Sequence, residues 1–266
     1  MPEKFKPRKP VLVLGCGYVG RALAAALSGK IKIVLTSRSG QRGAQGDALA
    51  PELFDLGRRD TWDVVESFEQ IVWTFPAATL HTDIRTALDF FETKNLAKKK
   101  VMVLGSTSSF AHKVPGELVD ESFLLELTQP RVVAEEQLRQ RSAFILCLAG
   151  IYGPGRDPAD WLKRGLVKNG ESYINLIHVN DIVKIVERWQ AAPDSFAGKR
   201  IAASDGRHRR WKEVFALMRE AGLLGADVNP FDLSLTESAA SKRVNNTLLQ
   251  QQLYPGSFHR YPEDGL

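Results

Sequence analysis

Three glycines near the start of the chain have a spacing that suits phosphate binding. Gly15, Gly17 and Gly20 follow a run of four apolar residues, and an alanine- and leucine-rich segment begins at once. In a strand–turn–helix sequence of this kind the first glycine permits a tight turn, the second admits a pyrophosphate and the third lets the helix pack closely. Tyr18 and Val19 then begin a helix whose N-terminus favours negative charge. The spacing predicts dinucleotide binding, with a purely structural turn as the alternative.

The residues after the second predicted strand bear on which dinucleotide is bound. A site for NAD usually has Asp or Glu about 20 residues beyond the glycines, where it holds the ribose 2′-hydroxyl. Here the chain has Thr36, Ser37, Arg38 and Ser39, with no acid among them. An arginine can pair with a 2′-phosphate, and neighbouring hydroxyls can add hydrogen bonds. We therefore predict NADP in preference to NAD, the alternative being that Arg38 is an exposed loop residue.

Further candidate residues follow other predicted strands. Asp55 and Leu56 close the third strand, Pro76 stops the fourth, and Ser106 follows the fifth. Ligands of a parallel sheet bind beyond the carboxyl ends of its strands. We therefore expect these residues to lie at the same edge of the sheet as the glycine turn, with Asp55 against the adenine.

Hydrophobic periodicity supplies the elements that must position these residues. Strands that alternate with helices predict an α/β fold, a Rossmann-type doubly wound parallel sheet with a small C-terminal substrate lobe. We expect residues 1–152 to form the dinucleotide-binding core, with 178–204 returning to it, and 153–177 and 205–266 to form the lobe. Asp181 is placed to cap the helix that follows it. The predicted strands are 11–14, 31–36, 52–56, 70–75, 101–104, 143–148 and 200–203, and the helices after the first are 62–68, 79–97, 134–141, 182–190 and 211–221.

Composition excludes several classes of protein. The 266 residues are 44% hydrophobic and 25% charged, which is ordinary for a soluble globular protein. No apolar run approaches the ~20 residues that span a bilayer, and the basic N-terminal segment 1–10 lacks an apolar signal segment. We therefore expect a cytoplasmic protein without a membrane partner. Cys16 and Cys147 are expected to be reduced core thiols, and the five histidines are too scattered to predict a metal site.

The net charge of +5 does not predict nucleic-acid binding. Positive residues are distributed among acidic ones, and neither a helix-turn-helix pattern nor a basic-aromatic stripe is evident. The basic run 207–210 is consistent with a solvated face or with an anionic substrate. A small-molecule substrate is therefore the expected partner.

Five stretches together resemble the atypical branch of the extended short-chain dehydrogenase/reductase superfamily, in its NAD-dependent epimerase/dehydratase group. They are 15–20, the serine cluster that runs into 110–111, 151–156, 177–181 and 241–245. The resemblance implies a Rossmann sheet that binds NAD(P) and a C-terminal lobe that holds a nucleotide sugar or another carbonyl or alcohol compound. Members of the superfamily often form homodimers, and the resemblance implies that the helices near 79–97 and 128–142 would form the interface here.

The family's catalysis uses a Ser or Thr that orients the substrate oxygen, a Tyr that exchanges its proton and a Lys four residues later. The cation is needed because a phenol near pKa 10 is a poor base at neutral pH. Ser106 matches the first position, and Thr107 is its nearest substitute. Leu127 stands at the tyrosine position and Arg131 at the lysine position, and none of the five tyrosines has a lysine four residues on. Arg131 is either a cofactor ligand or a surface helix residue.

Two hypotheses of different classes therefore remain. In the first, the protein is an NADP-dependent oxidoreductase or epimerase-like enzyme with a rebuilt proton relay, for which Tyr152 is the leading candidate and His112 and Ser106 are second choices. Packing against substrate, nicotinamide or protein is the alternative for Tyr152, and His178 is expected to be a satisfied interior histidine. In the second, the chain is a catalytically inactive NADP-binding regulatory or scaffold protein.

Overall fold

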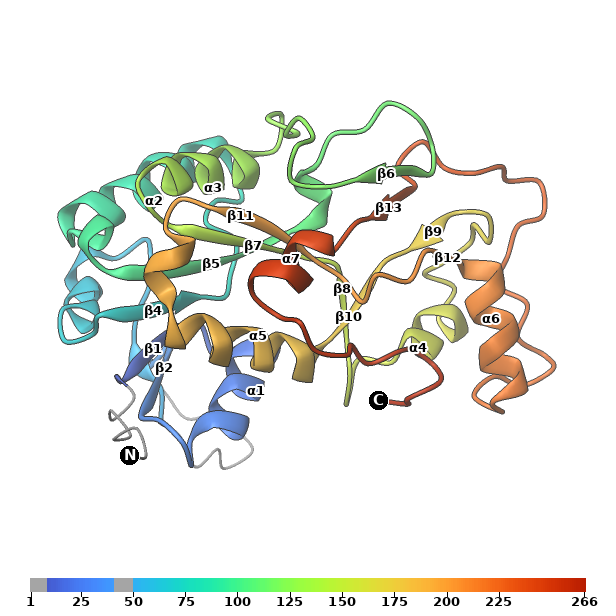
Figure 1. Cartoon of the computed structure of the whole chain (residues 1–266), viewed down its shortest axis with the longest axis horizontal. Helices are drawn as coiled ribbons and strands as arrows, with labels where there is room; N and C mark the ends of the chain where they lie inside the picture. The colour runs from blue at the N-terminus through green and yellow to red at the C-terminus, as the bar shows by residue number, and fades with distance from the viewer. Residues whose placement is uncertain (1–8, 41–49) are drawn as a thin grey trace. The chain divides into compact units, whose positions relative to one another are not determined.

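The largest sheet among the described residues is parallel, and its strands come from segments between residues 11 and 203. The computed structural model describes residues 9–40 and 50–266. Within these residues the sheet has seven strands in the order β3-β2-β1-β4-β5-β7-β11 (Figure 1). The chain order reverses between β1 and β4, which is the switch point at which doubly wound sheets bind ligands. The strands are β1 (Val11–Leu14), β2 (Ile33–Ser37), β3 (Glu52–Leu53), β4 (Gln70–Trp73), β5 (Lys100–Ser106), β7 (Phe144–Leu148) and β11 (Arg200–Ala203).

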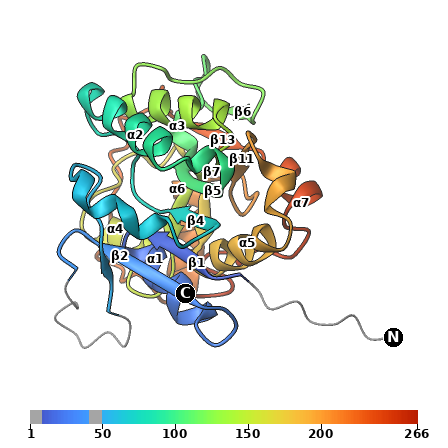
Figure 2. The same cartoon turned by 90° about the vertical axis from the view of Figure 1, so that its left-hand side faces the viewer.

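The apolar runs of the sequence become strands because both faces of the sheet are covered. β1, β4 and β7 are buried at every position, as expected for a parallel sheet between two layers of helices. Figure 2 shows α2 and α3 on one face and α1 and α5 on the other. The predicted α/β class and doubly wound parallel sheet are therefore confirmed. The helices are α1 (Tyr18–Leu27), α2 (His81–Thr93), α3 (Pro130–Gln140) and α5 (Val179–Ala191).

The chain divides into two compact units. The first comprises Met1–Gly105, Leu127–Leu146 and Ile185–Arg200, and the second comprises Ser106–Glu126, Cys147–Lys184 and Ile201–Leu266. The predicted assignment of a cofactor core and a substrate lobe concerns function and stays a prediction.

The second unit is built from short strand pairs and short helices around an apolar cluster that includes Leu162, Val214 and Met218. β8 pairs with β10 and β6 with β13 in parallel, whereas β9 and β12 are antiparallel. Its strands are β6 (Glu117–Val119), β8 (Gly150–Tyr152), β9 (Tyr173–Ile174), β10 (Leu176–His178), β12 (Arg209–Arg210) and β13 (Lys242–Val244), and its helices include α4 (Pro158–Lys163), α6 (Trp211–Glu220) and α7 (Thr247–Gln252).

Several predicted element boundaries are wrong. The third strand ends at Leu53 rather than at residue 56, because the backbone N–H of Asp55 binds Thr61 Oγ1 at 2.9 Å and turns the chain. The predicted helix 62–68 is a 3₁₀ helix over Arg59–Val65.

Two helix starts also differ from the prediction. α2 begins at His81 rather than at residue 79, because the side chain of Asp83 caps the preceding N–H groups. Asp181 lies inside α5, which begins at Val179, and is therefore not the residue that caps it. The basic N-terminal tail and the polar stretch after Gly40 lie largely outside the described residues.

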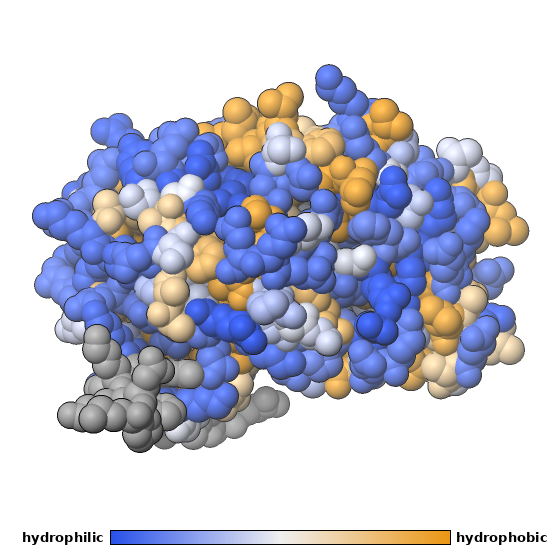
Figure 3. Space-filling model, viewed as in Figure 1, coloured by the Kyte–Doolittle hydropathy of each residue, from blue (hydrophilic) through white to orange (hydrophobic). Residues whose placement is uncertain are grey.

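The surface in the view of Figure 3 is mostly hydrophilic, with apolar residues interspersed. None of the helices in the described ranges is long and apolar enough to cross a membrane.

Candidate functional site

The turn after β1 has two glycines that the packing requires. Gly15 has φ +109°, and a β-carbon there would lie 2.6 Å from Thr74 Oγ1. A β-carbon on Gly20 would overlap the carbonyl oxygen of Gly15. The N–H of Gly15 donates to Thr36 Oγ1 at 3.1 Å, which ties the turn to β2. These contacts match the predicted roles of the first and third glycines, a tight turn and close helix packing.

Gly17 is different, because the protein itself does not need a glycine there. Its φ is −83°, and a β-carbon would meet no atom within 4 Å. Gly17 precedes the first residue of α1, and this helix has neither a side-chain cap nor an acidic residue in its first turn. No side chain of the helix therefore occupies the place of a phosphate, and a helix N-terminus attracts anions. The open backbone fits a bound pyrophosphate.

A cavity of about 830 Å³ lies beside this turn, within the first unit. Its volume is in the range of small-molecule and cofactor sites. It brings together seven of the residues proposed from the sequence. These are Gly15, Gly17, Ser37, Arg38, Asp55, Leu56 and Pro76.

The remaining predicted cofactor residues do not line the cavity. Val19 and Gly20 are buried in the first turn of α1, and Tyr18 is half-buried. They support the turn rather than the cavity wall.

Arg38 is the charged residue of the cavity wall that is available to a ligand. It is exposed and has no hydrogen bond or ion pair with another described residue. The other two charged side chains of the wall already have partners. Asp55 Oδ1 accepts the N–H of Gly57 at 2.9 Å. The carboxylate of Asp83 accepts hydrogen bonds from the N–H groups of Leu80 and Thr79 just before α2, and these bonds lower the pKa of Asp83. The wall is therefore suited to an anionic group beside Arg38.

Phe54 and Phe75 were missed by the sequence analysis and also line the cavity. Their ring centroids lie 6.3 Å apart. Each is next to a predicted site residue, Asp55 or Pro76, so position at a strand end was the signal that could have identified them. Phe75 is half-buried and supplies an apolar surface against which a planar base can pack, whereas Phe54 is only 2% exposed and packs behind it.

The serine cluster begins at the last residue of β5. Ser106 is half-buried, and its Oγ accepts the N–H of Ser108 at 3.2 Å as the cap of a 3₁₀ turn, Thr107–Ser109. Thr107 itself is buried. His112, a second-choice proton donor, bonds the carbonyl of Ala239 at 2.8 Å through Nε2. Of the two residues considered for orienting the substrate oxygen, Ser106 and Thr107, Ser106 therefore has the more accessible hydroxyl.

Arg131 is anchored by a buried acid. Its Nε lies 3.4 Å from Glu135 Oε1, one turn further along α3, and Glu135 is completely buried. Burial raises the pKa of Glu135, although Arg131 and Arg200 favour its charged form. Leu127, at the position that the family gives to tyrosine, is 56% exposed. The first unit thus has a fixed cation but no proton donor at these two positions.

Tyr152 is enclosed in the core of the second unit. Its ring centroid lies 4.9 Å from that of His178 and 5.3 Å from that of Tyr261, and the side chain is fully buried. Its hydroxyl has no hydrogen-bond partner among the described residues, and burial raises its pKa above that of an ordinary phenol. This environment favours packing over proton exchange.

His178 is buried in the same cluster. Its Nδ1 accepts the N–H of Asn180 at 3.1 Å, and burial lowers its pKa. Its Nε2 is buried without a hydrogen-bond partner among the described residues, so this histidine is interior but only half satisfied.

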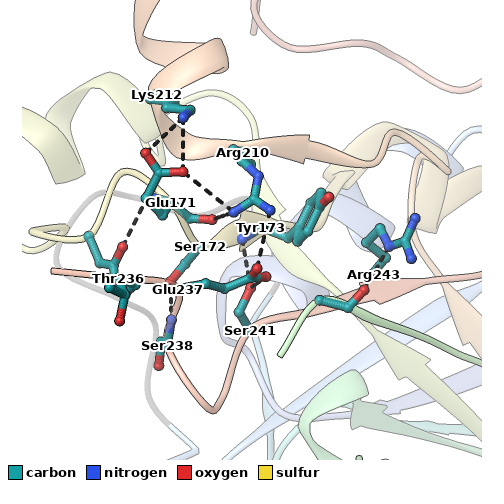
Figure 4. Close-up of polar contacts among 12 residues, drawn as sticks. Glu171, Ser172, Tyr173, Arg210, Lys212, Thr236, Glu237, Ser238, Ser241 and Arg243 are labelled. Carbon is teal, nitrogen blue, oxygen red and sulfur yellow. Dashed lines mark hydrogen bonds and ion pairs between the residues drawn. The ribbon is translucent and has the colours of Figure 1, made fainter. Parts of the chain in front are cut away.

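The basic run 207–210 is largely used by the second unit itself. Figure 4 shows Arg210 between Glu171 and Glu237 and beside Tyr173. It lies 3.1 Å from a carboxylate oxygen of Glu237 and 4.6 Å from the Tyr173 ring centroid. Arg209 pairs with Glu263 at 2.7 Å. Neither arginine is therefore a freely solvated cation.

Comparison with known proteins gives relatives of nearly the same length. No family model matches the chain. It is 24% identical to the protein YeeZ of Escherichia coli strain K12, over 96% of this chain and 97% of that one. MoeE5, solved with UDP-glucose and NAD, is 18% identical with a TM-score of 0.74, over 96% of this chain and 95% of MoeE5.

A third relative is the ADP-L-glycero-D-manno-heptose-6-epimerase of Helicobacter pylori, which is 14% identical with a TM-score of 0.71, over 97% of this chain and 94% of the epimerase. The chain therefore has the same fold as these solved structures, in agreement with the Rossmann-type fold that the resemblance of its motifs implied.

Proposed function

We propose that the chain binds NADP in the cavity of the first unit and is an oxidoreductase or epimerase-like enzyme. The observation that carries the proposal is that the open backbone of Gly17 and the guanidinium of Arg38, which has no ion pair with any residue that the structure describes, line the same cavity. The pyrophosphate would lie against Gly17 and the start of α1. Phe75 would contact the adenine, with Phe54 behind it and Asp55 at its edge.

The preference for NADP rests on the end of β2. A carboxylate there would hold the 2′-hydroxyl of NAD and repel a 2′-phosphate. The chain has Ser37 and Arg38 instead, a hydroxyl and a cation. MoeE5 was solved with NAD, which supports a nicotinamide cofactor in this fold, whereas the choice of NADP is argued from Arg38.

The proposed substrate is a small carbonyl or alcohol compound or a nucleotide-sugar-like molecule. The support is the fold shared with MoeE5 and the heptose epimerase. Ser106 would orient the substrate oxygen, because its hydroxyl is partly exposed at the end of β5. For a carbonyl substrate the reduced cofactor would supply the hydride, and a residue other than the family's tyrosine would supply the proton. For an alcohol the oxidised cofactor would accept the hydride and that residue the proton.

A second candidate function is NADP binding without catalysis. It is favoured by Leu127, which is exposed where the tyrosine would stand, and by the burial of Tyr152. In this function the nucleotide would regulate binding to a partner.

Calorimetric titration of nucleotide-free protein with NADP and NAD tests the cofactor. Micromolar NADP binding with much weaker NAD binding supports the site, and no binding of either nucleotide would overturn it. Oxidation of NADPH in the presence of a panel of aldehydes, ketones and nucleotide sugars then separates the enzyme from the binding protein. The homodimer and the cytoplasmic location stay predictions, and sedimentation measures the former.

A further inference from the structure

A second cavity, with a polar lining, lies in the second unit. It contains none of the candidate catalytic or cofactor residues, and Arg207 of its wall comes from the basic run 207–210. It has a volume of about 530 Å³. Its wall combines the loop after β11 with α7 and the C-terminal segment. Its polar lining residues include Asp205, Arg207, Asn246, Gln250, Ser257 and Arg260.

The two arginines of this wall are available to a ligand. Arg207 and Arg260 are exposed, and neither guanidinium has a hydrogen bond or ion pair with another described residue. Arg209 and Arg210, which belong to the same basic run as Arg207, are instead paired with acids. The two acids that follow Arg260 in the sequence have other contacts: Glu263 pairs with Arg209, and the carboxylate of Asp264 accepts the backbone N–H of Arg260 at 2.9 Å. Two cations from distant parts of the chain thus border one hollow.

The loop that carries Arg207 has a defined shape. The N–H of Arg207 donates to Asp205 Oδ1 at 2.9 Å, and Gly206 has φ +74°. Asn246 donates from its amide to the carbonyl of Ser204 at 2.9 Å, which ties this loop to the start of α7. The position of Arg207 relative to α7 is therefore set by the fold rather than by solvent.

We propose that this cavity is a binding site for a small molecule with a phosphate or other oxyanion group, separate from the cofactor cavity. Guanidinium groups bind such oxyanions with paired, charge-assisted hydrogen bonds. The amides of Asn246 and Gln250 and the hydroxyl of Ser257 offer further polar contacts to the rest of the molecule. The volume holds more than an inorganic ion, which is why an ester is expected.

Asp205 makes the site sensitive to pH. It is 9% exposed, and burial raises its pKa to about 7. Besides Arg207, the charged groups around it are Arg209, which favours the carboxylate, and Glu263, which opposes it. Above pH 7 the carboxylate becomes negative and repels an anion in the cavity.

The test uses sulfate, whose charge is the same at pH 6 and pH 8. The full chain, labelled with ¹⁵N-arginine, is titrated at constant ionic strength with chloride as the counter-titrant, and each Nε–Hε signal is followed. The signals of Arg207 and Arg260 should shift on one saturable curve. Arg207→Gln and Arg260→Gln should each weaken binding about tenfold, whereas Arg164→Gln, at an exposed arginine outside the cavity, should not.

Asp205→Asn should abolish the weakening of sulfate binding between pH 6 and pH 8. Equal, unsaturated shifts at every exposed arginine would mean bulk screening and would overturn the proposal, and so would normal binding by the two glutamine variants. The signal of Arg38 reports the cofactor cavity separately, so the result for one cavity does not decide the other.

Discussion

Gly20 packs so closely on Gly15 that a β-carbon on Gly20 would overlap the carbonyl oxygen of Gly15. Gly17, between them, has open space where its side chain would be. The three glycines therefore serve different ends: two are required by the fold, and one is left open for a ligand.

This difference predicts that one substitution lowers stability and the other prevents ligand binding. Gly20→Ala should destabilise the protein by about 3 kcal/mol, because neither helix nor strand can move away without loss of packing. Gly17→Val should change stability by no more than about 1 kcal/mol and should abolish NADP binding. Thermal denaturation and calorimetry measure the two effects. Normal NADP affinity in the Gly17 variant would reject the turn as a phosphate site.

Removal of the cation at the end of β2 tests the nucleotide preference. Arg38→Ala should weaken NADP binding by about 1.5–3 kcal/mol, the range of a charged hydrogen bond, and leave NAD binding nearly unchanged. Arg164→Ala, at an exposed arginine of the second unit, is the matched control. Equal losses for NADP and NAD would show that Arg38 does not contact the 2′-phosphate.

Tyr152 and Tyr261, whose rings pack against each other, should respond in opposite directions to replacement by phenylalanine. Tyr152→Phe should stabilise the protein by about 1 kcal/mol, because it removes a buried hydroxyl that has no hydrogen-bond partner in the described part of the chain. Tyr261→Phe should destabilise it by about 1–2 kcal/mol, because this hydroxyl donates to Asp157 and accepts the N–H of Ala159. Chemical denaturation at pH 7 measures both variants.

Turnover provides a second test of Tyr152. If the enzyme hypothesis holds, Tyr152→Phe should retain activity, since a buried phenol with a raised pKa is a poor proton donor. Loss of turnover with normal cofactor binding would instead return Tyr152 to the catalytic role considered from the sequence.

Asp205 predicts how stability depends on pH. Its pKa is about 7 in the folded protein against an ordinary value of 3.8, so the folded state holds the proton more tightly than the unfolded state. Stability should therefore fall as pH rises from about 4 to about 7, by a contribution on the order of 4 kcal/mol. Asp205→Asn should remove this contribution, which denaturation curves at pH 5 and pH 8 would measure. An unchanged pH dependence would show that Asp205 ionises as an ordinary carboxylate.

The residues that line the candidate cofactor cavity could be named from the chain alone because the pattern that brings them together is local. The turn at Gly15 and Gly17 joins consecutive elements, and Arg38 ends the strand next to the first one. Hydrophobic runs place such residues at the same edge of a parallel sheet, whatever the rest of the chain does. The strands at 11–14 and 200–203 were predicted to the residue for the same reason, since a buried run has few ways to pair.

The roles of residues in the second unit could not be predicted in the same way, because they depend on contacts between segments that are distant in the sequence. Tyr152 lies in the core because His178 and Tyr261, from distant segments, pack against its ring. Arg209 pairs with Glu263 and Arg210 with Glu237, whereas Arg207 has no ion pair with a described residue. Burial and pairing of this kind follow from which segments the fold brings together, so the residue types and their spacing could name candidates here but could not separate a core tyrosine from a catalytic one.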